Sequence, residues 1–149
     1  MAARPQEPRR VVVVAAVVER ADRILVTQRL AGTHLAGHWE FPGGKMEEGE
    51  DHRQCLEREM REELEVGVEV GDELHATSFD YPDRTVELHF YRCAIIGEPK
   101  PVLGQRMRWV SRAELKSLRL PPADLELIRL LATRRPARRQ SATAGTDAG

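Results

Sequence analysis

Short apolar runs and alternating apolar and polar positions predict most of the chain to form strands. Residues 11–18 are an unbroken apolar run rich in valine, which is typical of a strand buried on both faces. Residues 23–28 alternate around Ile24 and Val26 and predict a second strand that pairs with the first. Four further segments are expected to be strands, namely 66–70, 73–79, 85–95 and 108–110.

The clearest helical periodicity lies between residues 51 and 64. Leu56, Met60 and Leu64 recur at i, i+4 and i+8, and this spacing predicts one buried stripe. Asp51 is placed to cap the helix N-terminus through its side-chain oxygen.

Two later helices are expected at residues 112–117 and 123–132, with Ser111 as the cap of the first. In the second, Leu127, Leu130 and Leu131 are expected to face the core, with Ile128 at the edge. Strands, a helix, more strands and then helices indicate an α/β or α+β fold with a layered core.

Composition limits the choice of protein class. The chain has 149 residues, 41% hydrophobic residues and a formal net charge of −1, so one domain without a global attraction to nucleic acid is expected. Residues 1–9 are predicted to be a flexible arm, 10–133 the folded domain, and 134–149 a disordered basic tail. The apolar run at the N-terminus is too short to span a membrane.

The two cysteines, Cys55 and Cys93, have neither the spacing of a disulfide framework nor that of a zinc site. Two buried thiols in a reducing, cytoplasmic protein are therefore expected.

Acidic residues on the first helix are the strongest indication of chemistry. Glu59, Glu62 and Glu63 lie at i, i+3 and i+4, so their side chains share one helix face. Carboxylates held this close repel one another, and such a cluster is tolerated where it is solvated or binds a cation. Oxygen ligands of this kind suit Mg²⁺ or Mn²⁺, which also bind substrate phosphates.

The loop before this helix completes the pattern. Gly43 and Gly44 let the backbone approach a ligand closely, so its carbonyls and amides can join a cation or phosphate site. Glu50 and Arg58 are separated by about two helical turns, and we expect an ion pair between them to tie the loop to the helix.

These residues resemble the Nudix box, G-x₅-E-x₇-R-E-U-x-E-E-x-G-U, in which U is a bulky aliphatic residue. Its positions are occupied here by Gly44, Glu50, Arg58, Glu59, Met60, Glu62, Glu63 and Val66. One position departs, because Glu65 replaces the late glycine and Gly67 follows two residues later, so we expect the helix to end differently.

The resemblance extends over about residues 10–133 and favours the MutT-like branch of the Nudix family. The supporting segments are 26–29, 34–45, 79–84 and 121–124. It implies an α/β/α sandwich with a mixed β-sheet and a Mg²⁺-dependent hydrolase that converts a nucleoside triphosphate into the monophosphate and pyrophosphate. Mn²⁺ is a possible substitute for Mg²⁺.

The resemblance also implies roles for individual residues. The cation ligands would be Glu59, Glu62, Glu63 and the Gly43 carbonyl. Arg29 and Lys45 would contact phosphate, although a solvated lysine explains Lys45 nearly as well. Tyr81 would stack on the base, with a core aromatic as the competing interpretation. Asp124 stands where the branch recognises the base edge, and it also fits the cap position of the last helix.

The preferred substrate and the catalytic base stay open. Asp124 suits a base that offers an N–H donor, such as cytosine or an 8-oxopurine. Gln28 stands where some MutT-like enzymes have an arginine that helps to bind nucleotide. Relatives carry a glutamate shortly before the strand at 108–110, whereas residues 102–108 contain no carboxylate. Either Glu62 or Glu63 takes the proton, or no dedicated base is used.

Three functions therefore remain. The first is the removal of modified nucleotides such as 8-oxo-dGTP, with hydrolysis of CTP or dCTP as the alternative. The second is hydrolysis of a capped RNA end, supported only by the basic tail. The third is a catalytically silent nucleotide-binding module. A monomer or homodimer without a membrane or stable nucleic-acid partner is expected.

Overall fold

The computed structural model describes residues 9–33 and 35–133. The predicted tail at 134–149, His34 and all of the predicted arm except Arg9 lie outside the described residues. Arg9, which was expected to belong to the arm, is the first residue of a strand, and the domain boundary itself stays a prediction. No helix among the described residues is long and apolar enough to cross a membrane.

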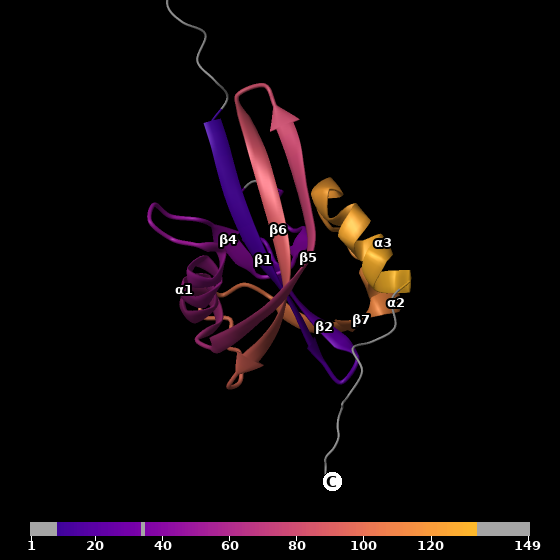
Figure 1. Cartoon of the computed structure of the whole chain (residues 1–149). Coiled ribbons are helices and arrows are strands. Elements are labelled where there is room, and N and C mark those ends of the chain that lie inside the picture. The colour runs from indigo at the N-terminus through magenta and orange to yellow at the C-terminus, as the bar shows by residue number, and fades with distance from the viewer. Residues whose placement is uncertain (1–8, 34, 134–149) are drawn as a thin grey trace, which may run out of the picture.

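A mixed sheet forms the middle layer of the molecule (Figure 1). Its main path is β3-β2-β1-β6-β5, with β4 added beside β1 and β7 beside β2. The β1–β6 pair is parallel, and the other pairs are antiparallel. The strands are β1 (Arg9–Arg20), β2 (Arg23–Gln28), β3 (Trp39–Glu40), β4 (Gly43–Lys45), β5 (Gly67–Tyr81), β6 (Arg84–Ile96) and β7 (Met107–Ser111).

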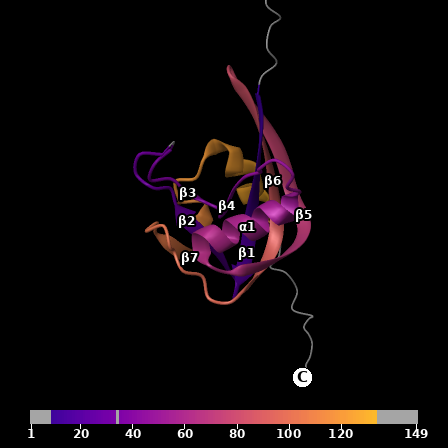
Figure 2. The same ribbon diagram turned by 90° about the vertical axis from the view of Figure 1, so that its left-hand side faces the viewer.

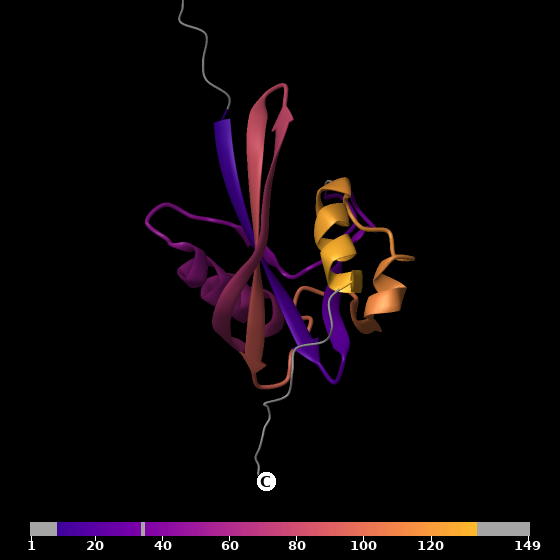
Figure 3. The same ribbon diagram turned by 45° about the vertical axis from the view of Figure 1, so that its right-hand side comes forward.

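Helices cover both faces of this sheet. Helix α1 (His52–Leu64) crosses one face, as Figure 2 shows, and the opposite face carries α2 (Arg112–Leu115) and α3 (Leu125–Thr133). A short 3₁₀ helix, η1 (Pro122–Asp124), leads directly into α3 (Figure 3). This arrangement confirms the α/β/α sandwich with a mixed sheet.

Strand β1 explains the unbroken apolar run, because both of its faces are buried. Val14 and Ala16 pack into the core under α1, whereas Ala15 and Val17 pack into the core under α3. The stripe expected on α1 is buried as predicted, and both cysteines are buried free thiols.

The long hairpin of β5 and β6 corrects the strand prediction. Residues 66–70 and 73–79 were expected to form two strands, but Gly67–Tyr81 is one strand paired with β6 along its length. The strand pairing shifts register between Val70 and Glu73 and again between Glu73 and His75, which accommodates the residues between the two expected strands. A bulge lets a strand continue through residues that break the alternation.

The inner face of α3 also differs from the prediction. Leu127, Ile128 and Leu131 are buried, whereas Leu130 is 38% exposed. Both sets of positions satisfy helical periodicity, so the rotation of this helix depends on its contacts with the sheet and α2.

At the end of α1, Glu65 occupies the position of the late glycine in the family pattern. This residue adopts the left-handed conformation (φ 55°, ψ 39°) that a glycine usually supplies, and its N–H donates to Arg61. Lys100 N–H donates to the Leu64 carbonyl (2.8 Å) and Val102 N–H to the Glu63 carbonyl (3.3 Å). Glu65 therefore ends the helix in the conformation that a glycine would adopt at this position, at the cost of backbone strain.

We expect Glu65→Gly to stabilise the protein by about 1 kcal/mol, because glycine has no Cβ to oppose this conformation. Urea unfolding measures the change, and Glu65→Ala, which keeps the Cβ, is the control. A glycine variant no more stable than the alanine variant would contradict the strain.

Candidate active site

The start of α1 is fixed by a reciprocal cap. Asp51 accepts a hydrogen bond from the Gln54 backbone N–H (2.7 Å), and the Gln54 side chain accepts one from the Asp51 N–H (2.9 Å). The predicted cap at Asp51 is confirmed. It fixes where the acidic face of α1 begins.

Arg58 connects the loop to the acidic face of the helix. Its guanidinium donates to both oxygens of Glu50 (2.5 and 3.0 Å) and to the Lys45 carbonyl (3.0 Å). It also donates to Glu59 (2.9 Å) and Glu62 (3.2 Å). The expected Glu50–Arg58 pair is therefore present and belongs to a larger brace.

This brace changes the ionisation of Glu50. The hydrogen bonds from Arg58, together with one from the Glu47 backbone, lower the pKa of the Glu50 carboxyl to about 2. Arg58 in turn has its pKa raised, chiefly by Glu50. Both groups stay charged over the whole physiological range.

Glu59 and Glu63 lie together beside the glycine loop. They line one hollow with Gly43, Gly44 and other residues of β1, β3 and β4. A Cβ on Gly44 would lie 2.4 Å from the Glu59 carboxyl carbon, and one on Gly43 would lie 2.1 Å from the Val14 carbonyl oxygen. Only glycine at these positions lets the carboxylate and β1 approach the loop this closely.

Glu62 does not share this hollow. Its side chain is 60% exposed and pairs with Arg58 on the outer surface. Of the three glutamates, Glu59 and Glu63 therefore line the hollow and Glu62 does not, and their role as cation ligands stays a prediction. In keeping with this, the described residues contain no group of three His, Cys, Asp or Glu side chains placed around one metal position.

The surroundings of Glu63 oppose the charged form of its carboxyl group. Burial, followed by the neighbouring Glu59 and then Glu40, raises the pKa of the Glu63 carboxyl. A backbone hydrogen bond from Gly43 opposes this effect. A cation would relieve the repulsion, and the oxygen donors of Glu59, Glu63 and the loop fit a hard divalent ion.

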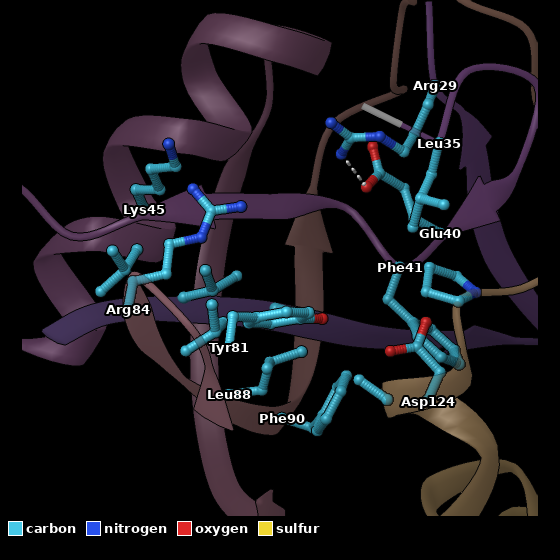
Figure 4. A pocket seen from close by; sticks show the side chains of 16 residues that line it. Arg29, Leu35, Glu40, Phe41, Lys45, Tyr81, Arg84, Leu88, Phe90 and Asp124 are labelled. Carbon is cyan, nitrogen blue, oxygen red and sulfur yellow. Dashed lines mark hydrogen bonds and ion pairs between the residues drawn. The ribbon is translucent and has the colours of Figure 1, made fainter. Parts of the chain in front are cut away.

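A second pocket, of about 300 Å³, opens from the same region onto the α3 face of the sheet (Figure 4). Phe41, Leu88 and Phe90 line it as apolar side chains, and Tyr81 and Asp124 come from opposite sides. Tyr81 is 44% exposed, so a core position for this aromatic ring is wrong.

Asp124 is the buried acid of this pocket, with 4% of its surface exposed. Burial, with a smaller contribution from Glu40, raises its pKa to about 7. Near neutral pH this side chain is therefore partly protonated and can donate as well as accept a hydrogen bond. The cap position of the continuous η1–α3 segment is Pro121.

Three cationic side chains surround the pocket. Arg29 and Lys45 line both the pocket and the carboxylate hollow, and their contact with phosphate stays a prediction. Arg84 lies beside Lys45 in Figure 4, with its guanidinium carbon 5.8 Å from the centre of the Tyr81 ring. Arg29 donates to Glu40 across 2.9 Å.

Several residues of the pocket were not assigned a role from the sequence. Glu40, Leu35 and Phe41 lie in the segment 34–45, and Arg84 lies in 79–84, both quoted for the family resemblance. The alternation of β6 could have located Leu88 and Phe90, because positions of one parity share a sheet face.

Two glutamines occupy positions that raised questions in the sequence. Gln28 donates from its side chain to the Gly37 carbonyl (3.0 Å), so it anchors the loop that follows β2. Gln105 lies in the stretch without a carboxylate. It accepts from the Leu103 N–H (2.9 Å) and donates to the Glu63 carbonyl (3.1 Å), so it supports the end of α1.

Comparison with known proteins agrees with this geometry. The NUDIX domain family profile matches residues 13–130. The chain therefore belongs to the Nudix family, and the fold, the acidic helix and its glycine loop are those of a hydrolase that acts on phosphorus anhydrides.

Among curated proteins, the CTP pyrophosphohydrolase of Escherichia coli K12 is 38% identical over 127 residues, covering 85% of this chain and 94% of its own length. The 8-oxo-dGTP diphosphatase of Haemophilus influenzae is also 38% identical over 127 residues, covering 83% and 93%. Among solved structures, the Escherichia coli ORF135 protein superposes with a TM-score of 0.77 at 36% identity, over 87% of this chain and 96% of that one.

We expect Glu50→Gln to make the free energy of unfolding depend less on pH in the acidic range. The pKa of Glu50 in the folded protein (about 2) lies below its ordinary value of 4.5, so its contribution to stability is complete above pH 4.5 and disappears as the pH falls toward 2. Urea unfolding at several pH values measures this, with Glu48→Gln, an exposed carboxylate of the same loop, as the control. If the free energy of unfolding falls with pH in parallel for Glu50→Gln and the native protein, the stabilising role of the Glu50–Arg58 ion pair is contradicted.

Proposed function

We propose that the protein hydrolyses nucleoside triphosphates to nucleoside monophosphates and pyrophosphate with the help of a divalent cation. One observation supports this most strongly. The hollow between Glu59, Glu63 and the glycine loop opens into an apolar pocket that ends at a buried Asp124. A triphosphate and a base need these two environments side by side.

Mg²⁺ is the cation we propose, with Mn²⁺ as a substitute. Glu59, Glu63 and the Gly43 carbonyl would hold it, and Glu62 would join them by turning from Arg58. When bound, such a cation neutralises charge on phosphate oxygens and makes the phosphorus more electrophilic.

The remaining residues bind, orient and accept a proton. Arg29 and Lys45 would contact the phosphates, and Arg84 extends this positive rim. Arg58 and Glu50 would hold Glu59 in place without touching substrate. Because residues 102–108 carry no carboxylate, Glu62 or Glu63 would accept the proton from the attacking water.

Tyr81 and Asp124 are proposed to recognise the base. The exposed ring of Tyr81 offers a stacking surface over an otherwise apolar floor. A partly protonated Asp124 can pair with an edge that offers both a donor and an acceptor, as an 8-oxopurine does. The ionised form suits the exocyclic amine of cytosine, which keeps CTP and dCTP as the second candidate substrates.

This specificity would place the enzyme in the removal of modified nucleotides such as 8-oxo-dGTP. The names of its relatives cover both the oxidised purine and the cytosine substrate. We propose that it works in the cytoplasm on free nucleotides, as a monomer or homodimer without a stable nucleic-acid partner.

Release of pyrophosphate from a panel of normal and oxidised triphosphates tests this function. With Mg²⁺, one modified purine or cytosine triphosphate should lead in kcat/KM. Glu63→Gln and Glu59→Gln should each lower kcat/KM by a factor of about 10² or more, because each would remove a carboxylate that holds the cation. Glu98→Gln, an exposed carboxylate outside the site, is the matched control.

Equal activity in the native protein and both glutamine variants would contradict the proposal. Tight nucleotide binding without any hydrolysis would favour the catalytically silent module instead.

A further inference from the structure

The base pocket and the carboxylate hollow share one wall, and this wall is where a substrate's sugar has to lie. Six residues line both cavities: Val13, Ala15, Arg29, Glu40, Phe41 and Lys45. This step rests on the proposed function, in which the base reaches Asp124 and the phosphates reach Glu59 and Glu63. The sugar joins the two and therefore meets this shared wall.

Three side chains of the shared wall can form hydrogen bonds, and they differ in whether they donate or accept. Arg29 and Lys45 are cationic donors without an acceptor, which suits phosphate oxygens. Glu40 is a carboxylate and therefore an acceptor. A sugar hydroxyl donates readily to such a group, whereas a phosphate is repelled by it.

Glu40 is held firmly in this position. It belongs to β3, where its backbone pairs with Thr27 of β2. Its Oε1 accepts from Arg29 Nη1 at 2.9 Å, and Figure 4 shows the two side chains together over the pocket. Among the described residues, this leaves Oε2 without a protein partner and available to a ligand.

The position of Glu40 between the two ends of the site is also visible in its electrostatic effects. Its charge contributes to the raised pKa of Asp124 at one end and of Glu63 at the other. It lines the base pocket, the carboxylate hollow and a third, smaller hollow beyond Arg29.

We propose that Glu40 determines specificity by accepting a hydrogen bond from a hydroxyl of the substrate's sugar and by repelling substrates that carry phosphate at that oxygen. In a deoxynucleotide this hydroxyl is the 3′-hydroxyl. The substrate class is then the free mononucleoside triphosphate. A 5′-triphosphate end of a polynucleotide, whose 3′-oxygen is esterified to phosphate, would be rejected by the same side chain.

The test compares a deoxynucleoside triphosphate with its 2′,3′-dideoxy analogue and with its 3′-phosphorylated analogue. Each is measured as kcat/KM with the native protein, Glu40→Ala, Glu40→Gln and the exposed control Glu98→Gln. Loss of the hydroxyl should lower kcat/KM about tenfold or more in the native protein and in Glu98→Gln, because the acceptor is charged. In Glu40→Ala the same loss should change it less than about twofold.

Glu40→Gln should discriminate less strongly against the 3′-phosphorylated analogue, because the amide keeps an acceptor but lacks the charge. The ratio of kcat/KM between two substrates is taken within each variant, so a disturbance of Arg29 or of folding that affects both substrates equally cancels. A single kcat/KM value would still contain that disturbance. An equal dideoxy penalty in the native protein and in Glu40→Ala would overturn the proposal.

The same three nucleotides can be compared without turnover as their non-hydrolysable α,β-methylene analogues. Calorimetry then measures the affinity of each analogue for the native protein and the variants. If the penalty for losing the 3′-hydroxyl depends on Glu40 in binding but no triphosphate is hydrolysed, the role of Glu40 is sustained and the proposed function is rejected. If triphosphates are hydrolysed but the penalty does not depend on Glu40, the proposed function is sustained and the role of Glu40 is rejected.

Discussion

Repulsion between the carboxylates of α1 is the constraint around which the whole site is arranged. Glu59 and Glu63 are one helical turn apart, and burial, followed by the charge of Glu59, raises the pKa of the Glu63 carboxyl. An isolated helix would turn these side chains outward into solvent. The brace of Arg58 and Glu50 on one side, and the glycine loop on the other, keep Glu59 against the backbone.

Strand β1 links this acidic site to the apolar pocket. On the α1 side it packs against the helix that carries the glutamates, and on the opposite side Val13 and Ala15 line the pocket wall. The parallel pairing with β6 adds Leu88 and Phe90 to the same floor. A nucleotide can therefore lie along the sheet with its phosphates at α1 and its base at η1.

Local patterns in the sequence were sufficient to predict α1, its cap at Asp51, its buried stripe and the Glu50–Arg58 pair. These features depend on residues close in sequence, where helix geometry dictates the contact. The fold class followed from the order of elements together with the family resemblance. The carboxylate hollow was predicted in part, since helical spacing alone did not show that Arg58 holds Glu62 outside it.

What the sequence did not predict depends on distant contacts. The continuity of β5 depends on pairing with β6, and the rotation of α3 depends on the core beneath it. Glu65 keeps its strained conformation because residues of the 100–105 loop bind the last carbonyls of α1. Glu40 was overlooked because its significance arises only where two cavities meet.

The identity of the cleaved bond tests the central claim most directly. Phosphorus NMR of a nucleoside triphosphate incubated with the native protein should show monophosphate and pyrophosphate, formed only when Mg²⁺ or Mn²⁺ is added. Formation of diphosphate and orthophosphate, or equal hydrolysis with the divalent cation removed by a chelator, would contradict the account.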